Sequence, residues 1–310
     1  MIVSAAMRTD IPAFYSEWFM RRVREGYVLS RNPYDPGTVL RYSLDPAAAD
    51  VLSFCTKDPR PMLDRLKELR QYAMFWSVTV TPYGRDIEPN VPDWRDMVEG
   101  VKALSAQVGA RRVHWRYDPV LLTKDVTVAF HRAVFAEMAE ALKGHVSACV
   151  FSFLDLYEKT RRNFPEGRAP SQQERHALAR SFAETARRAG LPLISCCEEP
   201  ALARYGIDVS GCMTRAVLER ALGERLDLAG ETGVRQACGC LIGHDIGAYN
   251  TCPHGCLYCY ANYDREAVRA HMMRHDPDSP LLVGRPLPGD RIVDVAMRPV
   301  RTGQLAMDLA

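Results

Sequence analysis

The pattern of hydrophobic and polar positions predicts short strands that alternate with longer amphipathic helices. Six runs are candidate strands, and several of them are apolar on both faces, as strands of a covered parallel sheet are. They span residues 2–7, 51–56, 73–80, 112–117, 147–154 and 192–197. Repeated strand-then-helix units with right-handed crossovers close naturally into a barrel. We therefore expect an α/β fold, built as a full or partial TIM-like (β/α) barrel.

Two helices can be delimited by the signals at their ends. The first should cover residues 93–108, where Asp93 is a suitable N-cap and apolar residues recur on one stripe. The second should cover residues 172–189, because Ser171 and Glu174 have the spacing of a capping box. Both helices lie between predicted strands, as crossover helices do.

The chain has no internal repeat and no long linker, so we expect one structural domain in three parts. Residues 1–235 should form the barrel core, 236–264 a cysteine-rich loop, and 265–310 a C-terminal helix and extended tail. Asp264 should cap that helix. The Pro- and Gly-rich tail after it should pack over the barrel and cover its open end.

The composition is that of a folded soluble protein. Of 310 residues, 47% are hydrophobic and 25% charged, and the net charge of +2 gives a nucleic-acid partner no support. No apolar run is long enough to span a bilayer, and Arg8 and Asp10 interrupt the N-terminal apolar stretch, so we expect neither membrane association nor a signal peptide. A cytoplasmic location follows. There, ten cysteines favour metal ligation or catalysis over disulfide bonds.

Polar residues gather directly after the predicted strands. In barrels of this kind the carboxyl ends of the strands form the active-site face. The side chains that we expect to bind or act on a polar or anionic substrate are Arg8, Asp10, Lys57, Arg116 and Asp118. For Asp10 the alternative is a purely local role, as the N-cap of a helix that starts near Pro12.

The segment TCPHGCLYCYAN holds three cysteines within eight positions. Cys252, Cys256 and Cys259 have the spacing C-x3-C-x2-C, and the Pro and Gly between the first two favour a loop over a helix. Thiolate is the soft ligand that iron–sulfur clusters require. Three ligands leave one iron of a 4Fe–4S cube open, and an open iron can chelate a small molecule.

Two alternatives remain for these three thiols. One is a structural zinc site, in a binding module that zinc stabilises. Zinc would need a fourth ligand, which Cys238, Cys240 or His254 could supply. The other is an iron–sulfur cluster with four protein ligands, in a non-catalytic electron carrier or sensor.

With an aromatic residue, Tyr258, before the third cysteine, the motif resembles the signature of the radical S-adenosylmethionine superfamily. The resemblance implies a 4Fe–4S cluster on the three cysteines and S-adenosylmethionine on the open iron. An electron donor such as flavodoxin or ferredoxin would reduce the cluster, which cleaves the cofactor to a 5′-deoxyadenosyl radical. The radical would act on a small-molecule or nucleotide-like substrate. The residues expected near the cofactor are Tyr258, Thr9 and Asn262.

Longer stretches resemble the bacterial domain-of-unknown-function family numbered 1848. They are RTDIPAFYSEWFMRRVREGYVLSRNPY near the start, WRYDP at 115–119 and CGCLIGHDIGAYNTCPHGCLYCYAN near the end. The cysteine cluster of that family has been likened to the radical S-adenosylmethionine cluster, but it lies at the C-terminal end. Superfamily members usually place the cluster loop after their first strand. A circularly permuted barrel reconciles the two positions, because its first and last strands are neighbours.

The permutation also decides which strand end should face the cofactor. The EEP sequence at 198–200 is similar to the Gly-Gly-Glu-Pro stretch with which the superfamily holds the amino group of the cofactor. Under permutation, however, the strand that follows the cluster strand is the first one in this chain. Its end carries Arg8, Thr9 and Asp10. We therefore expect these three residues to face the cofactor or the substrate.

Other cysteines indicate an auxiliary metal site, such as the second iron–sulfur cluster of many radical enzymes. The expected ligands are Cys238, Cys240, Cys212 and Cys197. Gly239 frees the backbone to aim two of these thiols. The alternative for Cys196 and Cys197 is that they end a buried strand as small apolar residues. Cys55 and Cys149 fall within predicted strands and should be core residues.

Overall fold

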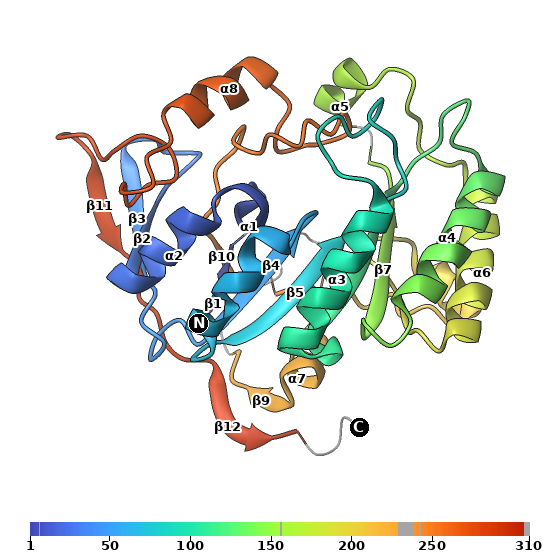
Figure 1. Ribbon diagram of the computed structural model, residues 1–310, viewed down its shortest axis with the longest axis horizontal. Helices are drawn as coiled ribbons and strands as arrows, with labels where there is room; N and C mark the ends of the chain where they lie inside the picture. Colours follow the sequence, from blue (N-terminus) through green and yellow to red (C-terminus); the bar gives the residue numbers. More distant parts are fainter. Residues whose placement is uncertain (6, 156, 229–238, 242, 307–310) are drawn as a thin grey trace.

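The computed structural model describes residues 1–5, 7–155, 157–228, 239–241 and 243–306, and its centre is a parallel sheet of seven strands (Figure 1). The strand order is β10-β1-β4-β5-β6-β7-β8. The strands are β1 (Ile2–Ser4), β4 (Val51–Thr56), β5 (Ala73–Thr79), β6 (Val113–Val120), β7 (Ala148–Phe153), β8 (Leu193–Ser195) and β10 (His244–Asp245). All six predicted strands are confirmed, and they are neighbours in chain order. The expected contact between the first and the last predicted strand is not formed, because β8 lies at the far edge of the sheet; β1 pairs instead with β10, a short strand that the sequence did not predict.

The sheet is open, so the expectation of a complete TIM barrel is not met. β10 and β8 form its two edges, and no strand in the described part of the chain joins them. Closure requires the edge strands to pair with each other. Here both edge strands are very short, and the inner face of the sheet is instead covered by α7 (Arg215–Leu222), whose apolar residues pack against it.

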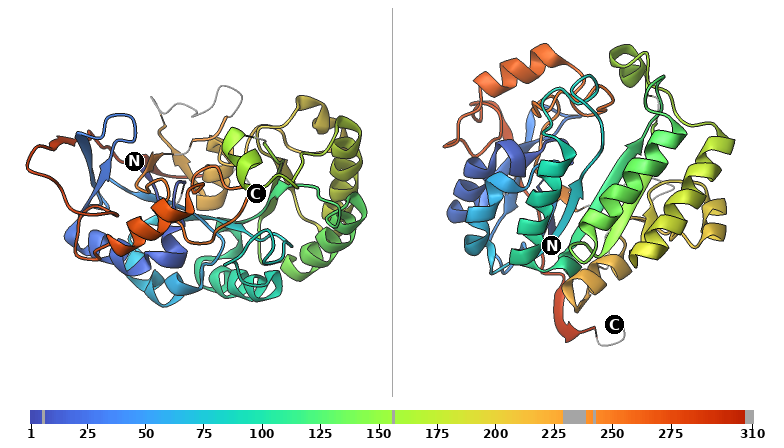
Figure 2. Two further views of the ribbon diagram at one scale, coloured as in Figure 1. Left: turned by 90° about the horizontal axis from the view of Figure 1, so that it is seen from above. Right: turned by 45° about the vertical axis from the view of Figure 1, so that its right-hand side comes forward.

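Helices cover the outer face of the sheet, side by side in chain order, and Figure 2 (left) shows them as an arc around it. They are α1 (Ile11–Phe14), the 3-10 helix η1 (Arg60–Leu69), α3 (Trp94–Val108), α4 (Val128–Leu142) and α6 (Gln172–Ala189). Side chains alternate between the two faces of each strand. Phe54, Trp76 and Trp115 therefore pack with the helices, whereas Val51 and Phe75 lie on the side of α7.

Both helices delimited from the sequence are confirmed. α3 begins after Asp93, whose side chain accepts a hydrogen bond from the Arg95 N–H. α6 has the predicted bounds, and its capping box is formed by Ser171 and Glu174. The remaining helical segments are α2 (Ser16–Glu25), η2 (Ala110–Arg112), α5 (Glu158–Asn163), η3 (Pro200–Tyr205) and α8 (Arg265–Met273). As predicted, Asp264 caps the last of these.

Two small sheets, which the sequence did not predict, hold the C-terminal tail. β11 (Arg291–Asp294) pairs with β3 (Thr38–Ser43), which also pairs with β2 (Tyr27–Arg31), and β12 (Arg301–Leu305) pairs with β9 (Glu224–Leu226). The ammonium of Met1 lies 2.5 Å from the Arg298 carbonyl oxygen. The tail from this point therefore lies at the amino end of the sheet. Within the Pro- and Gly-rich stretch at 275–291, which we expected to pack over the barrel, the Ser279 carbonyl accepts from Nε1 of Trp18 in α2 at 2.8 Å and the Pro280 carbonyl accepts from the Leu29 N–H of β2 at 3.0 Å.

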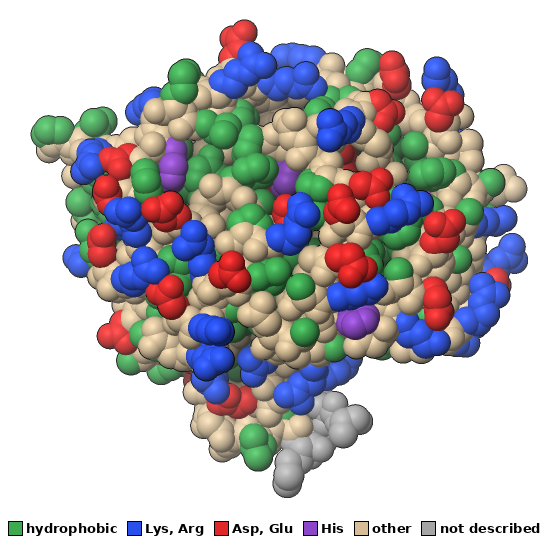
Figure 3. Space-filling view, viewed as in Figure 1, with side chains coloured by type: hydrophobic (Ala, Val, Ile, Leu, Met, Phe, Trp, Pro, Cys, Tyr) green, Lys and Arg blue, Asp and Glu red, His purple; other side chains and the backbone are tan. Residues whose placement is uncertain are grey.

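The helical side of the molecule carries basic and acidic side chains interspersed over its surface (Figure 3). Among the described residues on this face they form no extended patch of one sign. No helix in the described part of the chain combines the length and the apolar composition needed to cross a membrane.

Candidate metal centres

The loop with Cys252, Cys256 and Cys259 follows β10 and lies at the carboxyl edge of the sheet, between α5 and α8 (Figure 1). Cys252 and Cys256 are buried and Cys259 is half-buried. Burial raises the pKa of both buried thiols, and the charges of the other loop cysteines add to this increase. In each of the three pairs, the charge of one thiolate raises the pKa of a partner. The three sulfurs therefore lie within electrostatic reach of one another.

Hydrogen-bond donors favour the thiolate form of the loop cysteines. The backbone N–H groups of His254 and Asp10 donate to the sulfur of Cys252, which acts to lower its pKa. The Nδ2 atom of Asn262 lies 3.7 Å from the sulfur of Cys259. Donors of this kind stabilise an anionic sulfur, which is the form that ligates a metal.

Asn262 and Thr9, both expected near a cofactor, hold the loop in place. The Oδ1 atom of Asn262 accepts the backbone N–H groups of Thr251 and Cys252 at 2.7 and 2.8 Å. The hydroxyl of Thr9 lies 2.5 Å from that of Thr251 and donates to the Ala248 carbonyl at 2.8 Å. Both side chains thus connect the loop to itself or to the end of β1.

Asp10 joins three separate segments through its carboxylate. One oxygen accepts from the Ala13 N–H at 3.1 Å and from the Thr56 hydroxyl at 2.6 Å. The other accepts from the Lys57 N–H and from Nε2 of His254, both at 2.8 Å. The expected N-cap role is confirmed, and the same side chain also binds the end of β4 and the cysteine loop. It is placed to position the loop.

Lys57 lies in a second buried network beside the loop. Its ammonium is 2.7 Å from Oε1 of Glu88 and 2.9 Å from the Thr81 hydroxyl, and the Tyr258 hydroxyl donates to the same carboxylate. Burial acts to lower the pKa of Lys57, but the charges of Glu88 and Cys256 outweigh it, so this pKa is raised. A fixed positive charge therefore lies close to Cys256. Glu88 carried no signal in the sequence.

Arg8, Arg116 and Asp118, the other three residues expected to bind substrate, lie at two separate sites. Arg8 pairs with Asp245 of β10, with 2.5 Å between Nε and Oδ2, and so joins the first and last strands of the sheet. Arg116 and Asp118 form an ion pair near the end of β6. Arg8, Asp10 and Lys57 thus surround the cysteine loop, whereas the β6 pair lies near a second group of cysteines.

This second group consists of Cys196, Cys212 and Cys240, whose sulfurs all lie within 4.8 Å of one another and can hold a metal ion. The Arg116 guanidinium donates to the sulfur of Cys212 at 3.2 Å. Hydrogen bonds from the other two thiols, together with the charge of Arg116, lower the pKa of Cys212.

The predicted auxiliary ligands are partly brought together in this group. Cys212 and Cys240 belong to it, and Cys238 lies outside the described residues. Cys196 takes the place expected for Cys197. The reason is the alternation of β8: Ile194 packs on the inner face with α7, and the residue two positions later turns to the same side.

The two cysteine groups differ in their spacing. A single tetrahedral zinc ion with Zn–S bonds of about 2.3 Å places its sulfurs about 3.8 Å apart. The sulfur of Cys212 lies 3.5 Å from those of Cys196 and Cys240, close to that value. The loop cysteines, by contrast, do not form such a compact group among the described residues.

The described candidates for a fourth protein ligand to the loop thiols are engaged elsewhere. Nε2 of His254 is bound to Asp10, and its Nδ1 lies 3.4 Å from the Asn90 carbonyl oxygen. Cys240 belongs to the compact group. Cys238, the third candidate, lies outside the described residues.

Glu198, in the EEP sequence, lies after β8, at the edge of the sheet opposite β10. Burial raises the pKa of this carboxyl to about 7, although the Phe153 N–H and the charge of Arg175 act in the other direction. The strand order thus separates the EEP sequence from the cysteine loop and brings the end of β1 beside it.

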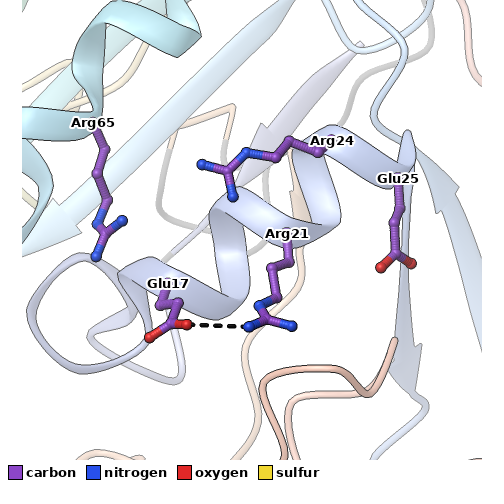
Figure 4. Close-up of a pocket in the computed structure, with 5 residues that line it drawn as sticks. All are labelled: Glu17, Arg21, Arg24, Glu25 and Arg65. Carbon is purple, nitrogen blue, oxygen red and sulfur yellow. Dashed lines mark hydrogen bonds and ion pairs between the residues drawn. The ribbon is translucent and has the colours of Figure 1, made fainter.

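A hollow of about 540 Å³ lies on the outer surface, at α2 (Figure 4). Its lining residues are all charged, and Glu17 pairs with Arg21 at 3.3 Å. The lining contains none of the described cysteines. We therefore do not connect this hollow with either metal centre.

A family model described as "Domain of unknown function (DUF1848)" matches residues 2–261 of the chain. The match begins in β1 and ends within the cysteine loop, so it includes every strand of the main sheet. Comparison with curated proteins and with solved structures gave no match.

Proposed function

The chain belongs to the DUF1848 family of domains of unknown function, and from its cysteine loop we propose that it is a radical S-adenosylmethionine enzyme. In this proposal Cys252, Cys256 and Cys259 hold a 4Fe–4S cluster, and S-adenosylmethionine binds the remaining iron. When bound and reduced, the cluster supplies the electron that cleaves a carbon–sulfur bond of the cofactor.

One observation carries the proposal: three thiols share one loop, and the described side chains that could supply a fourth metal ligand already have other partners. The nitrogen atoms of His254 contact Asp10 and Asn90, and Cys240 lies with Cys196 and Cys212. A site with three ligands and one open metal position is what the proposed chemistry requires.

The strand order supports the same proposal. We interpret the open sheet as a partial barrel that is circularly permuted relative to the superfamily. The cluster loop follows β10, and β10 pairs with β1. The loop therefore leaves an edge strand and lies beside the end of the next strand, as it would in an unpermuted barrel whose first strand carried it.

The surrounding residues fit the needs of a cluster and a polar substrate. The Lys57 ammonium lies near Cys256 and offsets part of the thiolate charge. Asp10 and Asn262 fix the backbone of the loop. Farther along the sheet, the ion pair of Arg116 and Asp118 offers both charges to a polar substrate.

The test is anaerobic purification with iron reconstitution, then reduction with dithionite in the presence of S-adenosylmethionine. We expect formation of 5′-deoxyadenosine. Cys256→Ala should lose both bound iron and cofactor cleavage, because two thiolates hold a cluster poorly. Cys55→Ala is the matched control, since it removes a half-buried thiol that belongs to neither cysteine group.

Two results would contradict the proposal. A brown protein that never cleaves the cofactor would indicate an electron carrier or sensor. A colourless protein with zinc on the loop cysteines would indicate a binding module stabilised by zinc.

A further inference from the structure

We propose that Cys196, Cys212 and Cys240 form a second metal site, which binds one thiophilic divalent ion of the zinc type. The site lies on the inner face of the sheet beside Arg116. It does not depend on the function proposed above, because it shares no ligand with the cysteine loop.

The spacing of the sulfurs favours one ion over a cluster. Both sulfur–sulfur distances from Cys212 are 3.5 Å, near the value of about 3.8 Å for a tetrahedral zinc site. A four-iron cube holds its thiolates on separate metal atoms and so needs them farther apart. An auxiliary iron–sulfur cluster therefore fits these three thiols less well than a single ion.

The groups around the sulfurs stabilise thiolates. The backbone N–H groups of Cys212 and Met213 donate to the sulfur of Cys240 at 3.2 and 3.4 Å. The Arg116 guanidinium donates to the sulfur of Cys212 at 3.2 Å. Three thiolates and a divalent ion carry one net negative charge, which the guanidinium offsets. Partners of this kind orient and tune metal ligands.

Two glycines allow the ligand segments to approach one another. A Cβ atom on Gly211 would lie 3.0 Å from the sulfur of Cys240, and the φ angle of this residue is +119°. A Cβ atom on Gly239 would lie 2.8 Å from the Ser210 carbonyl oxygen. Each glycine directly precedes a ligand cysteine. The close packing of these two Gly-Cys pairs is what brings their sulfurs together.

A bound ion would connect three parts of the fold. Cys196 follows β8, Cys212 precedes α7, and Cys240 lies on the segment that leads into β10. The ion would thus fix the helix that covers the inner face, together with the approach to the strand that carries the cysteine loop. Crosslinks between distant segments restrict the unfolded chain most.

The test is a Co²⁺ titration of the full chain with the loop cysteines removed, Cys252→Ala/Cys256→Ala/Cys259→Ala. We expect one ion per chain, held by the three thiolates and one water molecule, with the thiolate charge-transfer and d–d absorption bands of tetrahedral cobalt, and displacement by Zn²⁺. Cys212→Ser in this background should weaken binding by more than about 100-fold, since loss of even an outer partner costs about 10- to 100-fold. Cys55→Ser should leave binding unchanged.

Arg116→Lys keeps all three ligands and serves as the second variant, should Cys212→Ser fail to fold. It should weaken binding by about 10-fold, because Lys cannot reproduce the planar guanidinium contact. The proposal is overturned if the protein without the three loop cysteines binds no Co²⁺. It is also overturned if neither Cys212→Ser nor Arg116→Lys changes the affinity of that protein for Co²⁺. It is also overturned if this protein takes up iron and sulfide as a brown cluster. None of these results bears on cofactor cleavage by the intact loop.

Discussion

Asp10 has four hydrogen-bond donors arranged around its two carboxylate oxygens. One donor comes from the first turn of α1 and is predictable from the sequence as an N-cap. The other three come from Thr56, Lys57 and His254, which no local pattern connects to Asp10. Each buried donor left without an acceptor costs about 1–3 kcal/mol. This single side chain therefore joins β1, β4 and the cysteine loop.

Glu198 should make stability depend on pH. Its folded-state pKa is about 7, against an ordinary value of 4.5. At low pH the carboxyl is protonated in both states and costs nothing. As the pH rises through this interval the unfolded chain ionises first, so the free energy of unfolding should fall by up to about 3 kcal/mol.

Glu198→Gln should remove this part of the pH dependence. The measurement is urea unfolding of both proteins at about pH 5 and about pH 8. Most of the expected change in the free energy of unfolding falls between these two values. Equal pH dependence in wild type and variant would show that the carboxyl is not buried as described.

At the scale of elements, the segment between β5 and α3 is hydrogen-bonded to the cysteine loop through its backbone. The Asn90 N–H donates to the His254 carbonyl and the Leu257 N–H to the Ile87 carbonyl, both at 3.0 Å. Glu88 lies between these two contacts and accepts from Lys57. Backbone pairing thus fixes the position of the loop, and the buried ion pair fixes the charge beside it.

Glu88→Gln should destabilise the protein by about 3–5 kcal/mol, because it leaves the Lys57 ammonium buried without its counter-charge. The Lys57 side chain is only 11% exposed and that of Glu88 is fully buried. Urea unfolding gives the free energy directly. Adding Lys57→Met should recover part of the loss, since removing both charges of a buried pair is often neutral. A loss below about 1 kcal/mol would mean that the pair behaves as a surface ion pair.

At the scale of the whole molecule, the strand order places the candidate site beside β10, a short edge strand with few hydrogen bonds to the sheet. β4, β5, β6 and β7 are paired on both sides, whereas β10 has two residues and, within the described part of the chain, pairs with β1 alone. The loop that follows β10 lies outside the sheet and is held by backbone and side-chain contacts with neighbouring loops. Stability should therefore fall from the centre of the sheet toward the cysteine loop.

Hydrogen exchange should reveal this gradient. Amides of β5 and β6 should exchange slowly, and those of residues 244–262 quickly, in the metal-free protein. Iron reconstitution should slow exchange in 244–262, because a ligand at 100 times its Kd stabilises the bound form by about 2.7 kcal/mol. Mass spectrometry of peptic fragments measures both regions, with β6 as the internal reference. Unchanged exchange in 244–262 after iron uptake would place the metal elsewhere.

The sequence by itself determined the features that depend on near neighbours. Alternation and apolar runs located six strands, capping residues delimited α3 and α6, and three cysteines within eight positions marked the loop. These signals are local, since side-chain periodicity, helix caps and a ligand loop each involve residues a few positions apart.

Only the tertiary structure decided which distant segments meet. It left the sheet open, covered its inner face with α7, and selected Glu88 as the partner of Lys57. It also joined Cys212 to Cys196 and Cys240, which lie 16 and 28 positions away. Contacts over such separations depend on strand order and chain path, because many folds satisfy the same local pattern.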